Sequence, residues 1–97
     1  MPFAIILAPE AIEDLKSLKA NVRAEVRAAL KSHLRHEPKR LSRSRIKRLR
    51  GLRKPQYRLR VGEVRIFYDV TQTTVDILAI VTKSETKSWL ALFGNPE

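Results

Sequence analysis

Three arginines lie close together in a stretch whose pattern predicts a β-hairpin. Arg58 and Arg60 belong to one run of alternating apolar and polar residues, and Arg65 belongs to the next. Residues 62–63 between the runs predict a two-residue turn. Side chains at alternate positions of a strand share a face, and a guanidinium offers a planar fork of permanently charged donors to phosphate oxygens. The spacing therefore predicts a site for a phosphate-like anion.

The turn also predicts how the two strands pair. Strands 57–61 and 64–70 would place Arg60 opposite Arg65, with Phe67 on the same face. The other face would hold Tyr57, Leu59, Val61, Val64, Ile66 and Tyr68. A shift by one residue would turn the arginines into the core, so the pattern defends this register. Like charges opposite one another destabilise a sheet, which favours a bound anion, and Phe67 is a candidate for stacking on a base.

Positive charge is concentrated around this hairpin. The 27 residues from Lys39 to Arg65 contain twelve basic residues and one acid, whereas the whole 97-residue chain has a formal net charge of +10. The remainder of the chain is therefore close to neutral, and the charged segment suits a polyanionic partner. The alternative is a solvated basic face whose arginines pair with Asp69 or Asp76, and the scarcity of acids in this segment argues against it.

The elements that position these residues follow from periodicity and from helix start and stop signals. We expect a single domain over residues 1–97 with an α+β fold, in which a helical hairpin packs on one face of a small twisted antiparallel sheet. The order is strand 3–7, helix 9–18, helix 22–36 with Asn21 as its N-cap and Pro38 at its end, a partly irregular basic segment 39–54, strands 57–61, 64–70 and 74–82, and helix 85–93.

Other kinds of site have little support. The chain has no cysteine, and His33 and His36 lack a nearby third ligand, so we expect no metal and no cofactor. There is no phosphate-binding glycine loop and no catalytic triad. Trp89 lies at helical spacing with apolar neighbours, which favours packing. The apolar runs are too short to span a membrane or to form a signal peptide, so we expect a cytoplasmic protein.

Three runs of the sequence resemble a known protein family. The runs LAPEAIEDLKSL at 7–18, Leu49-Arg50-Gly51 and YRLRVGEVRIFYDV at 57–70 are similar to the RelE/ParE superfamily of type II toxins, and the resemblance covers residues 3–90. One branch of the superfamily cleaves mRNA on the ribosome, and the other poisons DNA gyrase. The long basic stretch and the tight hairpin look more similar to the RelE-like branch.

The resemblance implies a toxin that inhibits translation as a ribosome-dependent mRNA endoribonuclease, in which a ribose 2′-OH attacks the adjacent phosphate. Arg58 and Arg60 match the family's basic strand residues, and Arg65 matches its phosphate-stabilising arginine. Lys83 and Glu85 are further catalytic candidates. Residues expected along RNA are Arg43, Arg45, Lys47, Arg48, Arg50, Arg53, Lys54 and Phe67. The implied partners are the ribosome, mRNA and a cognate antitoxin with an acidic or amphipathic segment.

The C-terminal segment departs from the family pattern. Ser84 stands where RelE-like toxins commonly carry a basic residue, and Leu90 stands where they carry a tyrosine. Lys83, Lys87 or Trp89 would have to replace these groups. Two alternatives therefore remain beside the nuclease: a gyrase-directed toxin, and a catalytically weak RNA-binding member of the family.

Overall fold

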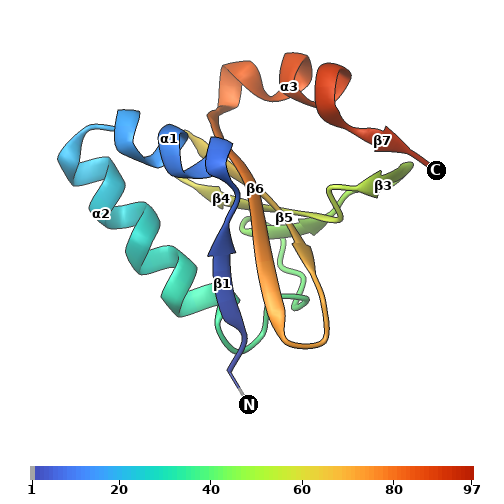
Figure 1. Ribbon diagram of the computed structural model, residues 1–97, viewed down its shortest axis with the longest axis horizontal. Coiled ribbons are helices and arrows are strands. Elements are labelled where there is room, and N and C mark those ends of the chain that lie inside the picture. The colour runs from blue at the N-terminus through green and yellow to red at the C-terminus, as the bar shows by residue number, and fades with distance from the viewer. Residues whose placement is uncertain (1) are drawn as a thin grey trace.

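The computed structural model describes residues 2–97 and contains a five-stranded sheet in the order β1-β6-β5-β4-β2. Its strands are β1 (Ala4–Leu7), β2 (Ile46–Arg48), β4 (Tyr57–Val61), β5 (Val64–Val70) and β6 (Thr74–Thr82). Neighbouring strands are antiparallel except at one edge, where β1 runs parallel to β6. The α+β class is confirmed, but the sheet is mixed rather than purely antiparallel. A crossover through the helical hairpin brings β1 to that edge (Figure 1).

Two helices connect β1 to the basic segment. Helix α1 (Pro9–Ser17) begins at a proline, whose missing N–H costs nothing in a first turn, and Glu10 lies near the positive end of the helix dipole. Helix α2 (Ala20–Ala29) continues into the π-helical segment η1 (Leu30–Leu34). The predicted N-cap at Asn21 is wrong, because the connection is shorter than expected. Two consecutive extended residues, Leu18 and Lys19, reverse the chain and place Lys19 at the N-cap.

The basic segment is more regular than expected. Strand β2 extends the sheet by pairing with β4, and β3 (Leu52–Lys54) pairs with the short C-terminal strand β7 (Asn95–Pro96). Gly51 provides the turn before β3 with a φ of 77°, a conformation that is easy only for glycine. The two short strands attach the basic segment to the hairpin and to the C-terminus.

The two faces of the sheet have different environments. On one face, side chains such as Leu59, Ile66 and Ile77 pack against α1, α2 and η1 and form the main core. The opposite face is partly covered by α3 (Thr86–Phe93), which follows the 3₁₀ turn η2 (Lys83–Glu85). Figure 1 shows the helical hairpin and α3 on different sides of the sheet. Over residues 2–97, no helix is long and apolar enough to cross a membrane.

Tyr57 and Tyr68 lie at the end of the hairpin far from its turn and on the core side of the sheet, as the alternation of apolar and polar residues predicted. The rings of Tyr57 and Tyr68 stack with centroids 5.4 Å apart. The Tyr68 hydroxyl donates a hydrogen bond to the Pro38 carbonyl at 2.7 Å. Burial raises the pKa of Tyr68 well above its ordinary value, so this hydroxyl is protonated and available as a donor at neutral pH. The contact holds the end of the helical hairpin against the sheet.

Candidate nucleic-acid interface

The predicted register of the hairpin is confirmed, and it gathers basic side chains on one face. Arg60 pairs with Arg65, and Arg58 pairs with Phe67, because the turn at residues 62–63 joins β4 directly to β5. Strand β2 adds a fourth cation, since Lys47 lies opposite Arg58 on the outer side of β4. The face therefore carries positive charge on three adjacent strands.

Arg58 is at the centre of this group and lacks an acceptor. Its side chain is partly buried, and its Nε atom is inaccessible to solvent and has no hydrogen-bond partner among residues 2–97. Burial lowers the pKa of the Arg58 guanidinium, and repulsion from Arg65 and Arg60 lowers it further. A buried donor without an acceptor is costly. An anion on this face would relieve both the missing hydrogen bond and the repulsion.

Arg65 and Arg60 differ in their exposure and in their hydrogen bonds. Arg65 is only 8% exposed, and its Nη1 donates hydrogen bonds to the carbonyls of Gly62 at 2.8 Å and Val64 at 3.1 Å. It therefore braces the hairpin turn while adding charge to the face. Arg60 is exposed. The two arginines lie opposite each other on β4 and β5. Arg65 therefore stabilises the turn, and Arg60 projects into solvent beside it.

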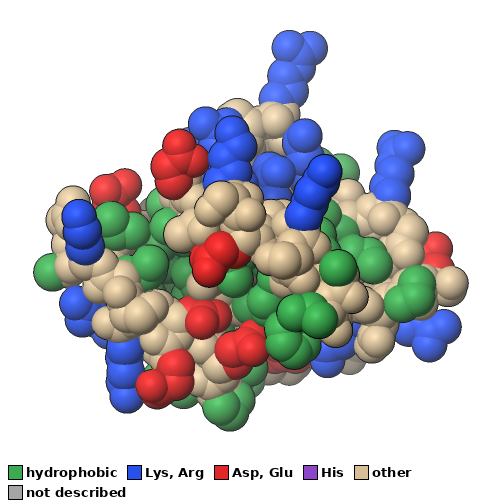
Figure 2. Space-filling view, turned by 90° about the horizontal axis from the view of Figure 1, so that it is seen from above, with side chains coloured by type: hydrophobic (Ala, Val, Ile, Leu, Met, Phe, Trp, Pro, Cys, Tyr) green, Lys and Arg blue, Asp and Glu red, His purple; other side chains and the backbone are tan. Residues whose placement is uncertain are grey.

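Most of the basic segment has no acidic neighbour. Only Arg40 and Lys54 of its nine basic residues form an ion pair within residues 2–97, with Glu37 at 3.0 Å and Asp69 at 3.9 Å. The solvated alternative required pairing to Asp69 or Asp76, and among the described residues neither acid pairs with an arginine of the hairpin. Figure 2 shows several Lys and Arg side chains projecting from the upper edge of the molecule, with further basic side chains at the left and right and most of the visible carboxylates in the lower part of the view. The face thus keeps its positive charge uncompensated.

The individual residues expected along RNA lie at different places in this segment. All seven basic positions of this set are exposed: Arg43, Arg45, Lys47, Arg48, Arg50, Arg53 and Lys54. Among them, Arg48 reaches back to the Gln56 carbonyl at 2.7 Å and lies over the Tyr57 ring at 5.3 Å. Lys54 is held near Asp69, whose Oδ1 also accepts a hydrogen bond from the Gln56 backbone at 2.7 Å. Arg48 and Lys54 therefore stabilise the segment as well as charging it.

Phe67 lies on the face of the hairpin that carries Arg58, Arg60 and Arg65, which we call the arginine face. It is not exposed. Its side chain is 0% accessible because the Trp89 ring stacks on it, with centroids 4.9 Å apart and planes at 4°. Trp89 also donates a hydrogen bond from its indole nitrogen to Glu10 at 3.2 Å. This burial contradicts the expectation that Phe67 offers an open surface to a base, and it confirms that Trp89 is a packing residue. α3 is attached to the sheet through this stack.

Lys83 and Glu85 lie where β6 ends, near the hairpin turn. The Lys83 backbone donates a hydrogen bond to the Glu63 carbonyl at 2.7 Å, which ties η2 to the turn beside Arg60 and Arg65. Glu85 completes a capping box: its Oε1 accepts hydrogen bonds from the Thr82 backbone at 3.0 Å and the Thr82 hydroxyl at 2.8 Å. These hydrogen bonds lower the pKa of Glu85, which makes it a weaker base.

Replacing Glu85 by glutamine separates capping from proton transfer. A glutamine keeps an oxygen that can accept the Thr82 hydrogen bonds but cannot take up a proton. For the RNA cleavage that the resemblance implies, we expect Glu85→Gln to keep the rate within about threefold, because a carboxylate whose pKa is lowered is a poor general base, whereas loss of a true general base costs at least about a hundredfold. Single-turnover cleavage rates would decide this, with Thr82→Ala as the variant that weakens the cap alone. A hundredfold loss in Glu85→Gln would make Glu85 the base.

Two parts of this interface were not evident from the sequence. One is the place of Lys47 beside Arg58, which depends on a three-residue strand with a single buried apolar residue, Ile46. The other is the Trp89 stack, which depends on where α3 docks. The aromatic spacing of α3 predicted packing without indicating Phe67 as the partner.

Comparisons with known proteins agree with the fold. Residues 5–86 match the family described as "ParE toxin of type II toxin-antitoxin system, parDE". No curated protein matches the sequence. The toxin-antitoxin complex RelBE2 of Mycobacterium tuberculosis contains a chain that is 28% identical, with a TM-score of 0.67 over 84% of this chain and 99% of that one.

Two Escherichia coli toxins share the fold at lower identity. A mutant of toxin RelE in the free state is 18% identical, with a TM-score of 0.69 over 92% of each chain. A chain of the DinJ-YafQ toxin-antitoxin complex is 16% identical, with a TM-score of 0.60 over 97% of this chain and 100% of that one. The family match spans most of the sequence, and the chain belongs to the ParE toxin family of type II toxin-antitoxin systems, within the RelE/ParE superfamily.

Proposed function

We propose that this toxin is a ribosome-dependent mRNA endoribonuclease that stops translation, and that its arginine face holds the scissile phosphate. The observation that carries the proposal is the partly buried Arg58, whose Nε has no acceptor within residues 2–97 and which lies between Lys47 and Phe67 on a face shared with Arg60 and Arg65. Cations held together without counterions are suited to an anion that is bound only transiently.

The chemistry would be attack of the ribose 2′-OH on the adjacent phosphorus. A new O2′–P bond forms, the 2′-OH proton passes to water, the bond to the 5′-oxygen breaks, and a 2′,3′-cyclic phosphate remains. Negative charge grows on the phosphoryl oxygens, and preorganised cations that stabilise such charge are usually the largest catalytic term. Arg58 and Arg60 would supply this stabilisation, and Lys83 could give a proton to the departing 5′-oxygen. Arg65 would keep the turn in place.

The exposed part of the basic segment would follow RNA on both sides of the cleavage site. Arg43, Lys47, Arg50 and Arg53 are exposed and have no ion pair among the described residues. Contacts of this kind are made to phosphates, so they confer affinity without sequence choice and weaken steeply with salt. The ribosome would supply the substrate and its register, which places the protein in the cytoplasm.

We also propose a cognate antitoxin as the partner that restrains the toxin. The solved relatives from Mycobacterium tuberculosis and Escherichia coli include toxin-antitoxin complexes. An acidic or amphipathic segment would complement the uncompensated charge of the basic face. The apolar side chains Leu92 and Phe93 of α3, exposed by 77% and 54%, offer additional surface to such a partner.

A gyrase-directed toxin is the second candidate, because the matching family is described by the name ParE. A weak RNA-binding member is the third, since Ser84 and Leu90 replace the expected basic residue and tyrosine. The gyrase function would not require the arginine face, so the variant Arg58→Ala, which removes no hydrogen bond made by the Arg58 Nε, would remain toxic if that candidate is right. This difference distinguishes gyrase from RNA as the target.

Induction in a bacterial host tests the proposed function. We expect growth to stop with a fall in protein synthesis, measured by amino-acid incorporation, while DNA stays intact. Growth arrest with broken DNA and continued translation would favour gyrase, and continued growth would favour the weak binder. Coexpression of the antitoxin encoded next to the toxin should restore growth.

A further inference from the structure

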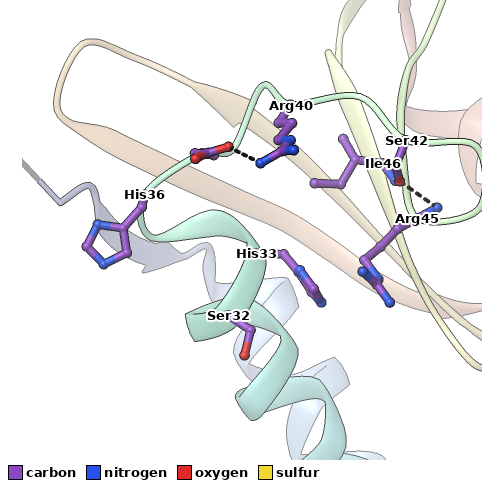
Figure 3. Close-up of a pocket in the computed structure, with 8 residues that line it drawn as sticks. Ser32, His33, His36, Arg40, Ser42, Arg45 and Ile46 are labelled. Atoms are coloured by element: carbon purple, nitrogen blue, oxygen red, sulfur yellow. Dashed lines mark hydrogen bonds and ion pairs between the residues drawn. The ribbon is translucent and has the colours of Figure 1, made fainter.

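A second group of anion-binding side chains lies away from the arginine face. A hollow of about 400 Å³ opens between η1 and the start of the basic segment. It is lined by Ser32, His33, His36, Glu37, Arg40, Ser42, Arg45 and Ile46. Figure 3 shows the side chains of His33 and Arg45 extending alongside each other from opposite walls, with His36 at a distant rim. Of these residues, only Arg45 is among those that the sequence predicts along RNA, and none lies on β4 or β5 beside Arg58, Arg60 and Arg65.

Arg45 and Ser42 are left with unused donors. Ser42 Oγ accepts hydrogen bonds from the backbone of Arg45 at 3.0 Å and of Ile46 at 3.1 Å, so its own proton is available to a third group. The guanidinium of Arg45 has no acceptor within residues 2–97, whereas that of Arg40 is already paired with Glu37 at 3.0 Å. The free charge of the hollow is therefore that of Arg45.

His33 is placed to add charge when an anion arrives. Partial burial lowers its pKa, and the neighbouring Arg45 lowers it further. The charged and titratable groups around the hollow are His33 and His36 from η1 and the turn after it, Glu37 and Arg40 from the following loop, and Arg45 before β2. A group with two negative oxygens between His33 and Arg45 would reverse the repulsion and favour the imidazolium.

We propose that the hollow between η1 and the basic segment binds a phosphate group, held by Arg45, Ser42 and His33. A phosphate suits this set because it has more acceptor oxygens than a carboxylate and a tetrahedral shape that can meet donors from two walls. The described residues contain no group of three or more His, Cys, Asp or Glu side chains that could hold a metal. The phosphate could belong to an RNA backbone or to a free phosphorylated molecule.

The hollow is linked to the hairpin through the backbone. The Arg60 N–H donates a hydrogen bond to the Arg45 carbonyl at 2.8 Å. Arg45 directly precedes β2, so a phosphate bound by its side chain would hold in place the backbone that pairs with Arg60. The inference concerns binding alone and does not require the protein to cleave RNA.

NMR titration of the full-length protein tests this site at its own residues. The probes are inorganic phosphate, an RNA trinucleotide and acetate, with the imidazole signals of His33 as the readout. We expect both phosphate probes to raise the pKa of His33 by at least about one unit. By linkage, the trinucleotide should then bind about tenfold more tightly when His33 is protonated than when it is neutral. The trinucleotide carries constant charge over this range, so the pH effect reports on the protein.

Variants separate the site from general charge. In Arg45→Ala the pKa of His33 in the free protein should rise, because a repelling charge is gone, while the response to phosphate is lost. Arg27→Ala on α2 removes the same charge elsewhere and should leave the response intact. Arg58→Ala should also leave it intact, so a failure of RNA cleavage and a failure of this site remain distinguishable.

The outcomes assign the phosphate's source or overturn the site. A stronger response to the trinucleotide than to inorganic phosphate supports an RNA backbone, and the reverse supports a free phosphorylated molecule. The proposal is wrong if neither phosphate probe shifts His33, if Arg45→Ala responds like the original protein, or if acetate acts as strongly as phosphate. The last result would indicate a carboxylate-bearing partner.

Discussion

Replacing Arg58 by alanine is expected to reduce cleavage of ribosome-bound mRNA by about a hundredfold to a thousandfold, the loss typical of removing one donor to a developing oxyanion. Folding should be little affected, because the Arg58 Nε makes no hydrogen bond within residues 2–97 and its charge is repelled by Arg60 and Arg65. Single-turnover rates and urea unfolding of the same preparation measure the two effects together.

Two controls sharpen this experiment. Arg58→Lys keeps the charge but not the fork of donors, so it should recover only part of the rate. Arg27→Ala removes an exposed arginine from α2, on the other side of the sheet, and should cleave at the original rate. Unchanged cleavage in Arg58→Ala would remove this residue from the chemistry.

The second large effect is expected at Phe67. Its side chain is fully buried between the sheet and Trp89, so Phe67→Ala should lower the free energy of unfolding by about 3 to 5 kcal/mol, from lost burial and from the cavity left behind. Trp89 would become more exposed to water, which should shift its fluorescence to longer wavelength. Urea unfolding followed by this fluorescence measures both changes.

The matched control for Phe67 is Phe93. It lies 5.4 Å from Trp89 by ring centroids but is 54% exposed. Phe93→Ala should therefore cost less than about 1.5 kcal/mol, since little apolar area is lost. Equal losses in the two variants would mean that Phe67 is not buried by α3 in solution.

The central hairpin was predictable because its signals are local. Strands 57–61, 64–70 and 74–82 have the predicted bounds, since alternation and short turns define both ends of each strand. The shared face of Arg58, Arg60 and Arg65 follows from the same pattern and from a two-residue turn that leaves a single register. Local pattern was thus sufficient to bring together the basic side chains of the candidate site.

Other features depend on contacts between distant parts of the chain. The run Ala4–Leu7 is apolar but does not specify that it pairs parallel to β6. The three-residue strands β2 and β3 have partners in β4 and at the C-terminus, and too few apolar residues to show a period. The burial of Phe67 depends on the docking of α3. In each case the partner, rather than the segment itself, determines the structure.

Mapping mRNA ends on purified ribosomes shows whether the toxin cleaves mRNA there. Ribosomes paused on a defined mRNA are treated with the toxin, and 5′ ends are located by primer extension. We expect cuts in fixed phase with the codon, absent without ribosomes and lost in Arg58→Ala. Intact mRNA in a preparation that arrests growth would contradict this expectation, and the accumulation of cleaved DNA with gyrase would then identify the other target.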